Sequence, residues 1–192
     1  MNNARSYTMR ARAVSAEATR QRILEVAVSL LSTRFRSEIR LEHVAVKAHV
    51  TVQTVINVFG GKSRLLDEAL AGLLRKVRAQ RLRAAPGDLP CGIAALVDHY
   101  ECFGDLVLRN LAEEADRELI ETGRAGHRRW VQRQFAPQID RLDAEHRRAT
   151  VDALVCVCDV YSWKLLRRDM GRSRGETEAT MLAMAEAIIA AA

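Results

Sequence analysis

The sequence is poor in helix-breaking residues and in aromatic residues. Its 192 residues include three prolines and ten glycines, and aromatic residues make up 5% of the chain. Proline and glycine interrupt helices, and the runs of alternating β-branched residues that mark strands are almost missing. The sequence therefore predicts an all-α protein, and its length allows one large or two small domains.

Cysteine is also scarce, and the four cysteines are scattered: Cys91, Cys102, Cys156 and Cys158. A disulfide scaffold in a chain of this length needs more of them. Cys156 and Cys158 are two positions apart on an expected helix, so they point in nearly opposite directions and cannot share one metal ion. We interpret the cysteines as small apolar core residues, with a redox or metal sensor as the alternative.

Three further classes of protein lack their sequence signals. No run of about 18 apolar residues is present, which argues against a membrane-spanning helix. The first residues lack the apolar core of a secretory signal, so we expect a cytoplasmic protein. No motif of a serine hydrolase, a zinc protease or a phosphate-binding loop occurs. We therefore predict no enzyme, no metal site and no cofactor.

Positive charge is concentrated in the first half of the chain. Residues 1–83 contain 16 Lys and Arg against 6 Asp and Glu, whereas residues 84–192 contain 14 against 18. The net charge is therefore +10 in the first part and −4 in the second, within a total of +6. Such an excess predicts contact with a polyanion. A basic surface that meets only solvent is the alternative.

Residues 41–59 have the pattern of two short helices joined by a tight turn at His49, Val50 and Thr51. The apolar positions of each helix fall on one face, so both helices can close over one small core. Ala45 is small where two steeply crossing helices approach, and Thr51 is well placed to cap the second helix. The predicted core positions are Val44, Ala45, Ala48, Val55, Val58 and Phe59.

The remaining positions of the second helix are expected to face outward: Val52, Gln53, Thr54 and Asn57. Side-chain amides pair with the N6 and N7 atoms of adenine, and the methyl groups of Thr and Val suit the methyl group of thymine. We therefore predict that these four residues contact base edges. Lys62 opens the next helix, where a lysine opposes the helix dipole unless a phosphate binds there. A chance arrangement of packed helices is the alternative.

From residue 23 to residue 66 the chain resembles the DNA-binding domain of TetR-family transcriptional regulators. The resemblance rests on an amphipathic helix at residues 23–31, followed in order by Val44, Ala45, Ala48, Val50, Thr51, Thr54, Val55, Phe59, Lys62, Leu65 and Leu66. It implies that Arg40, Thr51 and Lys62 contact the DNA backbone. Three positions depart from the family pattern, because His49 replaces the usual turn glycine, Ile56 a phosphate-binding tyrosine and Arg40 a Ser or Thr.

The breaks in the sequence predict four parts. Residues 1–14 carry arginines without periodicity and are expected to form a disordered basic arm, either a DNA contact or an idle tail. Residues 15–61 form the helix-turn-helix DNA-binding domain, whose first helix starts at Ser15, and residues 62–83 form a long linking helix. Residues 84–192 form a helical ligand-binding and dimerisation domain after a Pro-Gly break. Its predicted helices span 92–103, 105–121, 124–142, 147–169 and 177–191.

The last two expected helices are apolar on more than one side and need a cover, either from their own domain or from a second copy. The TetR resemblance implies that they pair with those of another subunit as a four-helix bundle. A homodimer also suits DNA recognition, because one short helix reads few base pairs. Two copies can read half-sites of a palindrome about 34–36 Å apart.

Six of the nine aromatic residues lie between residues 100 and 163. Together with interspersed polar residues they suit an apolar ligand pocket, and core packing is the alternative for each ring. The carboxylates of Asp98 and Asp159 favour an aromatic or cationic compound. The resemblance implies that such an effector moves the linking helix. The predicted pocket residues are His99, Tyr100, Phe103, Trp130, Phe135, Asp159 and Trp163.

The sequence thus predicts a homodimeric, ligand-responsive transcriptional regulator, a repressor, that binds palindromic double-stranded operator DNA and responds to an unidentified small-molecule effector. Its rival is a helical dimer that binds a small molecule or a partner without specific DNA readout. The three departures from the family pattern, at His49, Ile56 and Arg40, support the rival.

Overall fold

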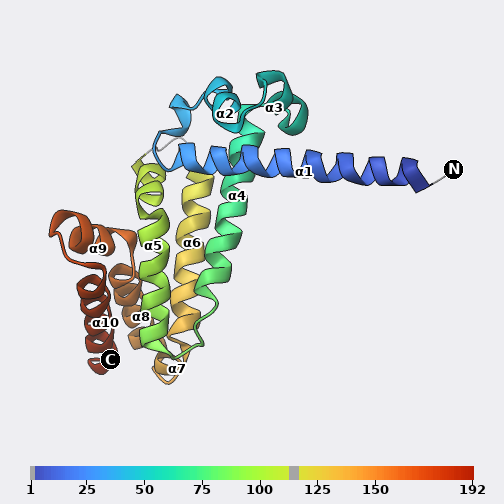
Figure 1. The fold of residues 1–192 in the computed structure, drawn as a ribbon. Helices are drawn as coiled ribbons and strands as arrows, with labels where there is room; N and C mark the ends of the chain where they lie inside the picture. The colour runs from blue at the N-terminus through green and yellow to red at the C-terminus, as the bar shows by residue number, and fades with distance from the viewer. Residues whose placement is uncertain (1–2, 113–116) are drawn as a thin grey trace. The chain divides into compact units, whose positions relative to one another are not determined.

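The computed structural model describes residues 3–112 and 117–192, and every element within them is helical (Figure 1). The all-α prediction is therefore confirmed for this part of the chain. The elements in order are α1 (Asn3–Leu31), η1 (Arg36–Glu38), α2 (Leu41–Ala48), α3 (Val52–Phe59), α4 (Lys62–Arg81), α5 (Leu89–Ala112), α6 (Arg117–Gln134), α7 (Ala136–Ile139), α8 (Ala144–Val157), α9 (Val160–Lys164), η2 (Leu165–Asp169) and α10 (Arg174–Ala190).

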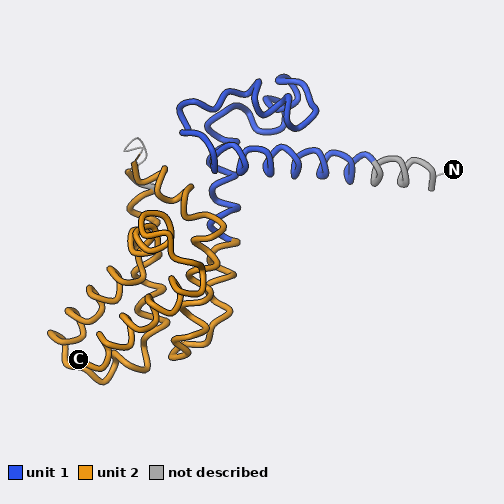
Figure 2. Tube along the Cα trace, turned by 60° about the vertical axis from the view of Figure 1, so that its left-hand side comes forward, with its two compact units in different colours: residues 1–75 blue, residues 76–192 orange. Residues whose placement is uncertain are grey.

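The chain divides into two compact units, unit 1 at residues 1–75 and unit 2 at residues 76–192 (Figure 2). The division falls inside α4, so this helix contributes its first turns to unit 1 and its last turns to unit 2. Each unit has buried apolar residues of its own.

Unit 1 closes over one small apolar core. The inward stripe of α1 includes Ile23, Ala27, Leu30 and Leu31, and α1 packs against α2, which packs against α3. This stripe follows the spacing of a helix with one buried face. The other buried apolar residues of the unit are Ile39, Val44, Ala45, Ala48, Val55, Phe59, Leu65, Leu66, Ala69, Leu70 and Leu73.

Helix α1 begins at Asn3, although the sequence predicts a disordered arm at residues 1–14 and a helix start at Ser15. That expectation is corrected for the backbone of residues 3–14. Residues 3–31 contain no proline or glycine and are rich in alanine and arginine, so nothing in them interrupts a helix. Residues 1 and 2 lie outside the described residues.

Unit 2 is a set of packed helices in which α5 contacts α6, α9 and α10, while α8 contacts α6 and α10. Its core is rich in large side chains that are almost completely buried. The core residues are Ile93, Leu96, Val97, Tyr100, Trp130, Val131, Phe135, Ile139, Val151, Leu154, Cys158, Val160, Trp163, Met181 and Ala185.

The glycines of α5 and α6 do not end helices, which corrects the predicted breaks at Gly104 and Gly123. Gly104 lies inside α5, under the indole of Trp163, and its lack of a side chain leaves room for the ring. A Cβ atom there would lie 2.4 Å from Cζ3 of Trp163. The glycine is needed for close packing, not for a turn. Residues 113–116 of the helix predicted at 105–121 lie outside the described residues.

The single helix predicted at residues 147–169 is wrong, because α8 ends at Val157 and α9 begins at Val160, with Asp159 as its N-cap. The Asp159 carboxylate accepts a hydrogen bond from the Tyr161 N–H at 3.0 Å and caps α9. Ser162 Oγ donates to the Cys156 carbonyl at 2.7 Å, which satisfies a carbonyl at the end of α8. A π-helical turn, η2, follows α9 directly.

The prediction that the cysteines are core residues holds for one of them. Cys158 is buried, whereas Cys91, Cys102 and Cys156 are exposed. Burial raises the pKa of the Cys158 thiol to about 12, so it behaves as a small apolar side chain.

Candidate nucleic-acid interface

The turn between α2 and α3 places His49 in the left-handed region, with φ 53° and ψ 48°. The Val50 N–H donates to the Ala45 carbonyl at 3.0 Å, and the His49 N–H donates to the Val46 carbonyl at 3.2 Å. These two bonds form a Schellman motif, which satisfies carbonyls at the end of α2. The tight turn predicted at His49 is therefore present, with His49 in the left-handed conformation.

Helix α3 is capped by Thr51, as predicted. The Thr51 hydroxyl oxygen accepts a hydrogen bond from the Thr54 N–H at 3.1 Å, and the two hydroxyl groups lie 2.8 Å apart. The cap satisfies a backbone donor at the start of a helix of eight residues, which is too short to persist alone. Thr51 is exposed and Thr54 is half-buried.

The outward face of α3 carries two amides that bond to each other. Gln53 and Asn57 are exposed, and Gln53 Nε2 donates to Asn57 Oδ1 at 2.9 Å. This bond uses one donor and one acceptor, and it leaves the Gln53 oxygen and the Asn57 amide nitrogen for another partner. Val52 lies half-buried at the start of the same helix.

The inward face of α3 is narrower than the sequence predicts. Val55 and Phe59 are buried, but Val58 is 39% exposed, so its predicted place in the core is wrong. Ile56 is also exposed, at 38%. An eight-residue helix buries only the residues on the side that meets its neighbours, and Val58 lies at the edge of that side. The outward face therefore mixes amides with apolar side chains.

Helix α3 itself carries no charged residue, so cations near it come from other elements. Arg40 precedes α2, and its side chain is exposed while its backbone N–H donates to His43 Nδ1 at 3.3 Å. Lys47 on α2 and Arg64 on α4 are also exposed. Any phosphate contact in unit 1 would thus come from the flanking elements.

Lys62 has a partner that sequence reasoning missed. Its Nζ atom donates to the Ser37 carbonyl at 3.0 Å, which ties the first turn of α4 to the segment before α2. This bond gives Lys62 a structural role in the first turn of α4. Its contact with a phosphate stays a prediction, because an ammonium group has three donors and one is used here.

Two arginines of α1 also hold unit 1 together. Arg22 Nε donates to the Ala48 carbonyl at the end of α2 at 2.9 Å. Arg20 pairs with Glu68 of α4 and lies over the ring of Phe59, 5.2 Å from its centroid. Sequence reasoning did not identify these roles, because the partners are 26 and 48 residues away.

The predicted pocket residues come together in unit 2, where most of them form its core. His99, Tyr100, Trp130, Phe135 and Trp163 are buried. Phe103 and Asp159 are half-buried. Two of the buried rings are bonded within the unit, since Tyr100 Oη donates to the Cys158 carbonyl at 2.9 Å and Trp163 Nε1 donates to Glu101 at 2.9 Å.

The two carboxylates proposed as anchors for a cationic ligand are used elsewhere. Asp159 caps α9, and Asp98 lies exposed in an ion pair with Arg174, with 2.6 Å between Oδ1 and Nη2. Both carboxylates thus have partners within the unit, and their contact with a cationic ligand stays a prediction.

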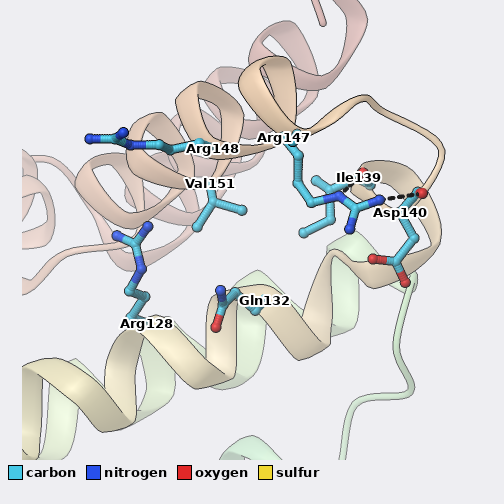
Figure 3. A pocket seen from close by; sticks show the side chains of 8 residues that line it. Arg128, Gln132, Ile139, Asp140, Arg147, Arg148 and Val151 are labelled. Carbon is cyan, nitrogen blue, oxygen red and sulfur yellow. Dashed lines mark hydrogen bonds between the residues drawn. The ribbon is translucent and has the colours of Figure 1, made fainter.

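A hollow of about 370 Å³ opens on a different side of unit 2, between α6 and α8 (Figure 3). Arg147 lines it, but its guanidinium donates to the carbonyls of Ile139, Asp140 and Leu142. None of the predicted pocket residues lies in this hollow. Its lining residues are Arg128, Gln132, Ile139, Asp140, Ala144, Arg147, Arg148 and Val151.

Burial keeps the two interior histidines of unit 2 neutral. It lowers the pKa of His99 to about 2, with further lowering by Arg81 and His127, and it lowers the pKa of His127 to about 4. Burial also raises the pKa of Tyr100 well above its usual value. At neutral pH both histidines are therefore uncharged, and the cation beside them is Arg81, a residue that the sequence did not single out.

Comparisons of the chain with protein-family models, curated proteins and solved structures gave no match. Within residues 3–112 and 117–192, no three His, Cys, Asp or Glu side chains are grouped as metal ligands. None of the described helices is long and apolar enough to cross a membrane.

Proposed function

We propose that this protein is a transcriptional regulator of the TetR type that binds operator DNA through α3. The observation that carries the proposal is the exposed amide pair of Gln53 and Asn57 on a capped helix that follows a tight turn. The Asn57 amide nitrogen can donate to N7 of an adenine, while the Gln53 oxygen accepts from its N6. The mutual bond holds both amides in place before DNA arrives.

The distribution of charge supports contact with DNA through unit 1. Residues 1–75 contain 12 Lys and Arg against 6 Asp and Glu, a net charge of +6, whereas residues 76–192 contain 18 of each. A basic unit beside a neutral one directs a polyanion to the basic unit. In this proposal Arg40, Thr51 and Lys62 contact phosphates, while Val52 and Thr54 contact thymine methyl groups, and the protein works in the cytoplasm.

A homodimer is part of the proposal. Four apolar residues of α10, Leu182, Met184, Ile188 and Ile189, are only partly buried by their own unit, so a second copy can cover them. Two copies would present two α3 helices to the half-sites of a palindrome. The proposed output is repression, relieved or enhanced by a small-molecule effector bound in unit 2.

The test is a footprint of the purified protein on the DNA that flanks its own gene, repeated over a series of salt concentrations. We expect a protected palindrome, with an affinity that falls steeply as salt rises, because phosphate contacts release counterions. Gln53→Ala and Asn57→Ala should each weaken operator binding by about 1–3 kcal/mol. Unchanged operator affinity in both variants would show that this pair does not read bases.

Gln21→Ala is the matched control. Gln21 Nε2 donates to Glu25 Oε1 at 2.9 Å on the exposed side of α1. This variant therefore also loses a side-chain hydrogen bond between residues four positions apart on a helix. It should leave operator affinity unchanged. A loss equal to that of Gln53→Ala would mean that the effect is a general change in unit 1.

A partner-binding dimer without DNA readout is the second candidate. The observation in its favour is that α3 has no charge and exposes Ile56 and Val58 beside the amides, which suits an apolar protein surface. Weak protection spread evenly over any DNA in the footprint would favour this candidate.

A further inference from the structure

Arg81 is a cation in the interior of unit 2. It is 8% exposed, and its guanidinium carbon lies 5.5 Å from the ring centroid of Tyr100 and 5.3 Å from that of Trp130. Its Nη1 lies 3.4 Å from Nδ1 of His127. Among the described carboxylates none forms an ion pair with Arg81. Buried arginines are usually paired, so this one needs an explanation.

Two polar atoms at this place have no hydrogen-bond partner. They are Nε of Arg81 and Nδ1 of His99, and both are buried. An unbonded polar atom in the interior is costly, and native structures keep few of them. Because burial keeps His99 and His127 neutral, they add no second positive charge beside the guanidinium, and a neutral imidazole cannot act as its counterion.

Three carboxylates of unit 2, two on α5 and one at the start of α9, already have partners. Glu101 accepts hydrogen bonds from both Arg167 and Trp163. Asp98 is paired with Arg174 at the surface, and Asp159 caps α9. None of these three carboxylates forms an ion pair with Arg81. A ligand carboxylate would give Arg81 the ion pair that it lacks within the described part of the chain.

We infer that Arg81, His99, Tyr100 and Trp130, the Arg81 cluster, bind the carboxylate of a small aromatic acid. A guanidinium recognises a carboxylate through charge-assisted hydrogen bonds, and the free Nε atom is one donor for it. His99 can donate to the same group through Nδ1 in one of its neutral tautomers. The rings of Tyr100 and Trp130 suit the flat apolar body of the ligand.

Two half-buried ring side chains lie beside the cluster. Phe103 lies against His99, with 5.8 Å between ring centroids, and His127 is stacked near Trp130 at 6.2 Å. Both reach the surface in part, unlike His99 and Tyr100. The ligand class is thus opposite in charge to the one that Asp98 and Asp159 suggested. Its role as the effector rests on the proposed function, whereas its binding does not.

Isothermal titration calorimetry with 2-naphthoate tests the site, with 2-naphthamide as the uncharged ligand of nearly the same shape. We expect the acid to bind unit 2 of the full chain at least about tenfold more tightly than the amide. Arg81→Met should remove this preference. It should also leave the midpoint of thermal unfolding unchanged or higher, because a buried unpaired charge is lost. Arg78→Met, at an exposed position on the same helix, is the control and should change neither.

Two results would overturn the inference. One is equal binding, or no binding, of the acid and the amide to the wild-type chain. The other is an Arg81→Met variant that binds the acid normally and unfolds at a lower temperature, which would make the arginine a structural contact of the two rings.

These titrations contain no DNA, so the two proposals fail separately. Tight binding of the acid without a protected operator would keep the site and reject the regulator. A protected operator without binding of the acid would keep the regulator and reject the site. If both hold, the acid should change operator affinity in the wild type and leave it unchanged in Arg81→Met.

Discussion

One arginine of unit 2, Arg81, differs from the paired arginines of unit 1. In unit 1, Arg20 and Arg36 pair with Glu68 and Asp67 of α4, near the surface. In unit 2, Arg81 is enclosed by aromatic rings and pairs with none of the described carboxylates. Water and nearby carboxylates stabilise the first two, whereas the third loses its hydration without a counterion. Unit 1 carries the net positive charge, yet the buried arginine without an ion pair lies in unit 2, whose net charge is zero.

The histidines differ between the units as well. His49 is exposed in the turn of unit 1, and its backbone conformation is what matters there. His99 and His127 lie in unit 2, where burial lowers their pKa values. Residues of one type therefore act through the backbone in one unit and through their protonation in the other. Three measurements test the differences between the two units.

The largest expected effect is the acid sensitivity of unit 2. The folded pKa values of His99 and His127, about 2 and about 4, lie below the unfolded value of 6.5. The unfolded chain therefore takes up protons first, and their contribution to stability is complete above pH 6.5 and is lost as the pH falls. Together they should lower the free energy of unfolding by about 3 kcal/mol between pH 7 and pH 5.

Urea unfolding followed by tryptophan fluorescence checks this, because both tryptophans, Trp130 and Trp163, lie in unit 2. His99→Leu has no titratable group at that position, so it should lose about half of this pH dependence whatever its stability at pH 7. A pH dependence identical to that of the wild type would contradict the assignment.

The next effect tests how tightly unit 2 is packed. Gly104→Ala places a methyl group 2.4 Å from a Trp163 ring atom, so it should lower the free energy of unfolding by about 2 kcal/mol. Gly123→Ala is the control, because nothing lies within 4 Å of its Cβ position. The control should raise stability by about 0.5–1 kcal/mol through helix propensity. Equal effects in the two variants, measured by urea unfolding, would reject the packing explanation.

The smallest effect concerns the backbone of unit 1. His49 has a side chain and adopts the left-handed conformation, which is strained. His49→Gly removes this strain, so it should stabilise unit 1 by about 1 kcal/mol. Gly60, with φ 79°, ends α3 in the same region, and Gly60→Ala should destabilise the unit by a similar amount. Amide hydrogen exchange of residues 41–59 measures both. Faster exchange in His49→Gly would be the wrong sign for relief of strain.

Much of unit 1 could be predicted because its signals are local. The cap by Thr51, the turn at His49 and the inward positions Val44 and Val55 each depend on residues within about five positions, and the structure has them as expected. Val58 failed because burial at the edge of a helix depends on the neighbouring element. In unit 2 the predicted helix break at Gly104 failed for the same reason, since this glycine packs against Trp163, 59 residues later in the chain.

By itself, the sequence determined the helical class, the two short helices around residues 49–51, and the outward position of Gln53 and Asn57 on the second of them. Helical period and capping groups act between neighbours along the chain, so a sequence contains them in full. Only the tertiary structure decided that Lys62 bonds to Ser37, that the aromatic residues pack as a core, and that Arg81 is buried without a described counterion. Those facts depend on which distant segments meet, because burial and pairing are properties of the space around a side chain and not of its position in the chain.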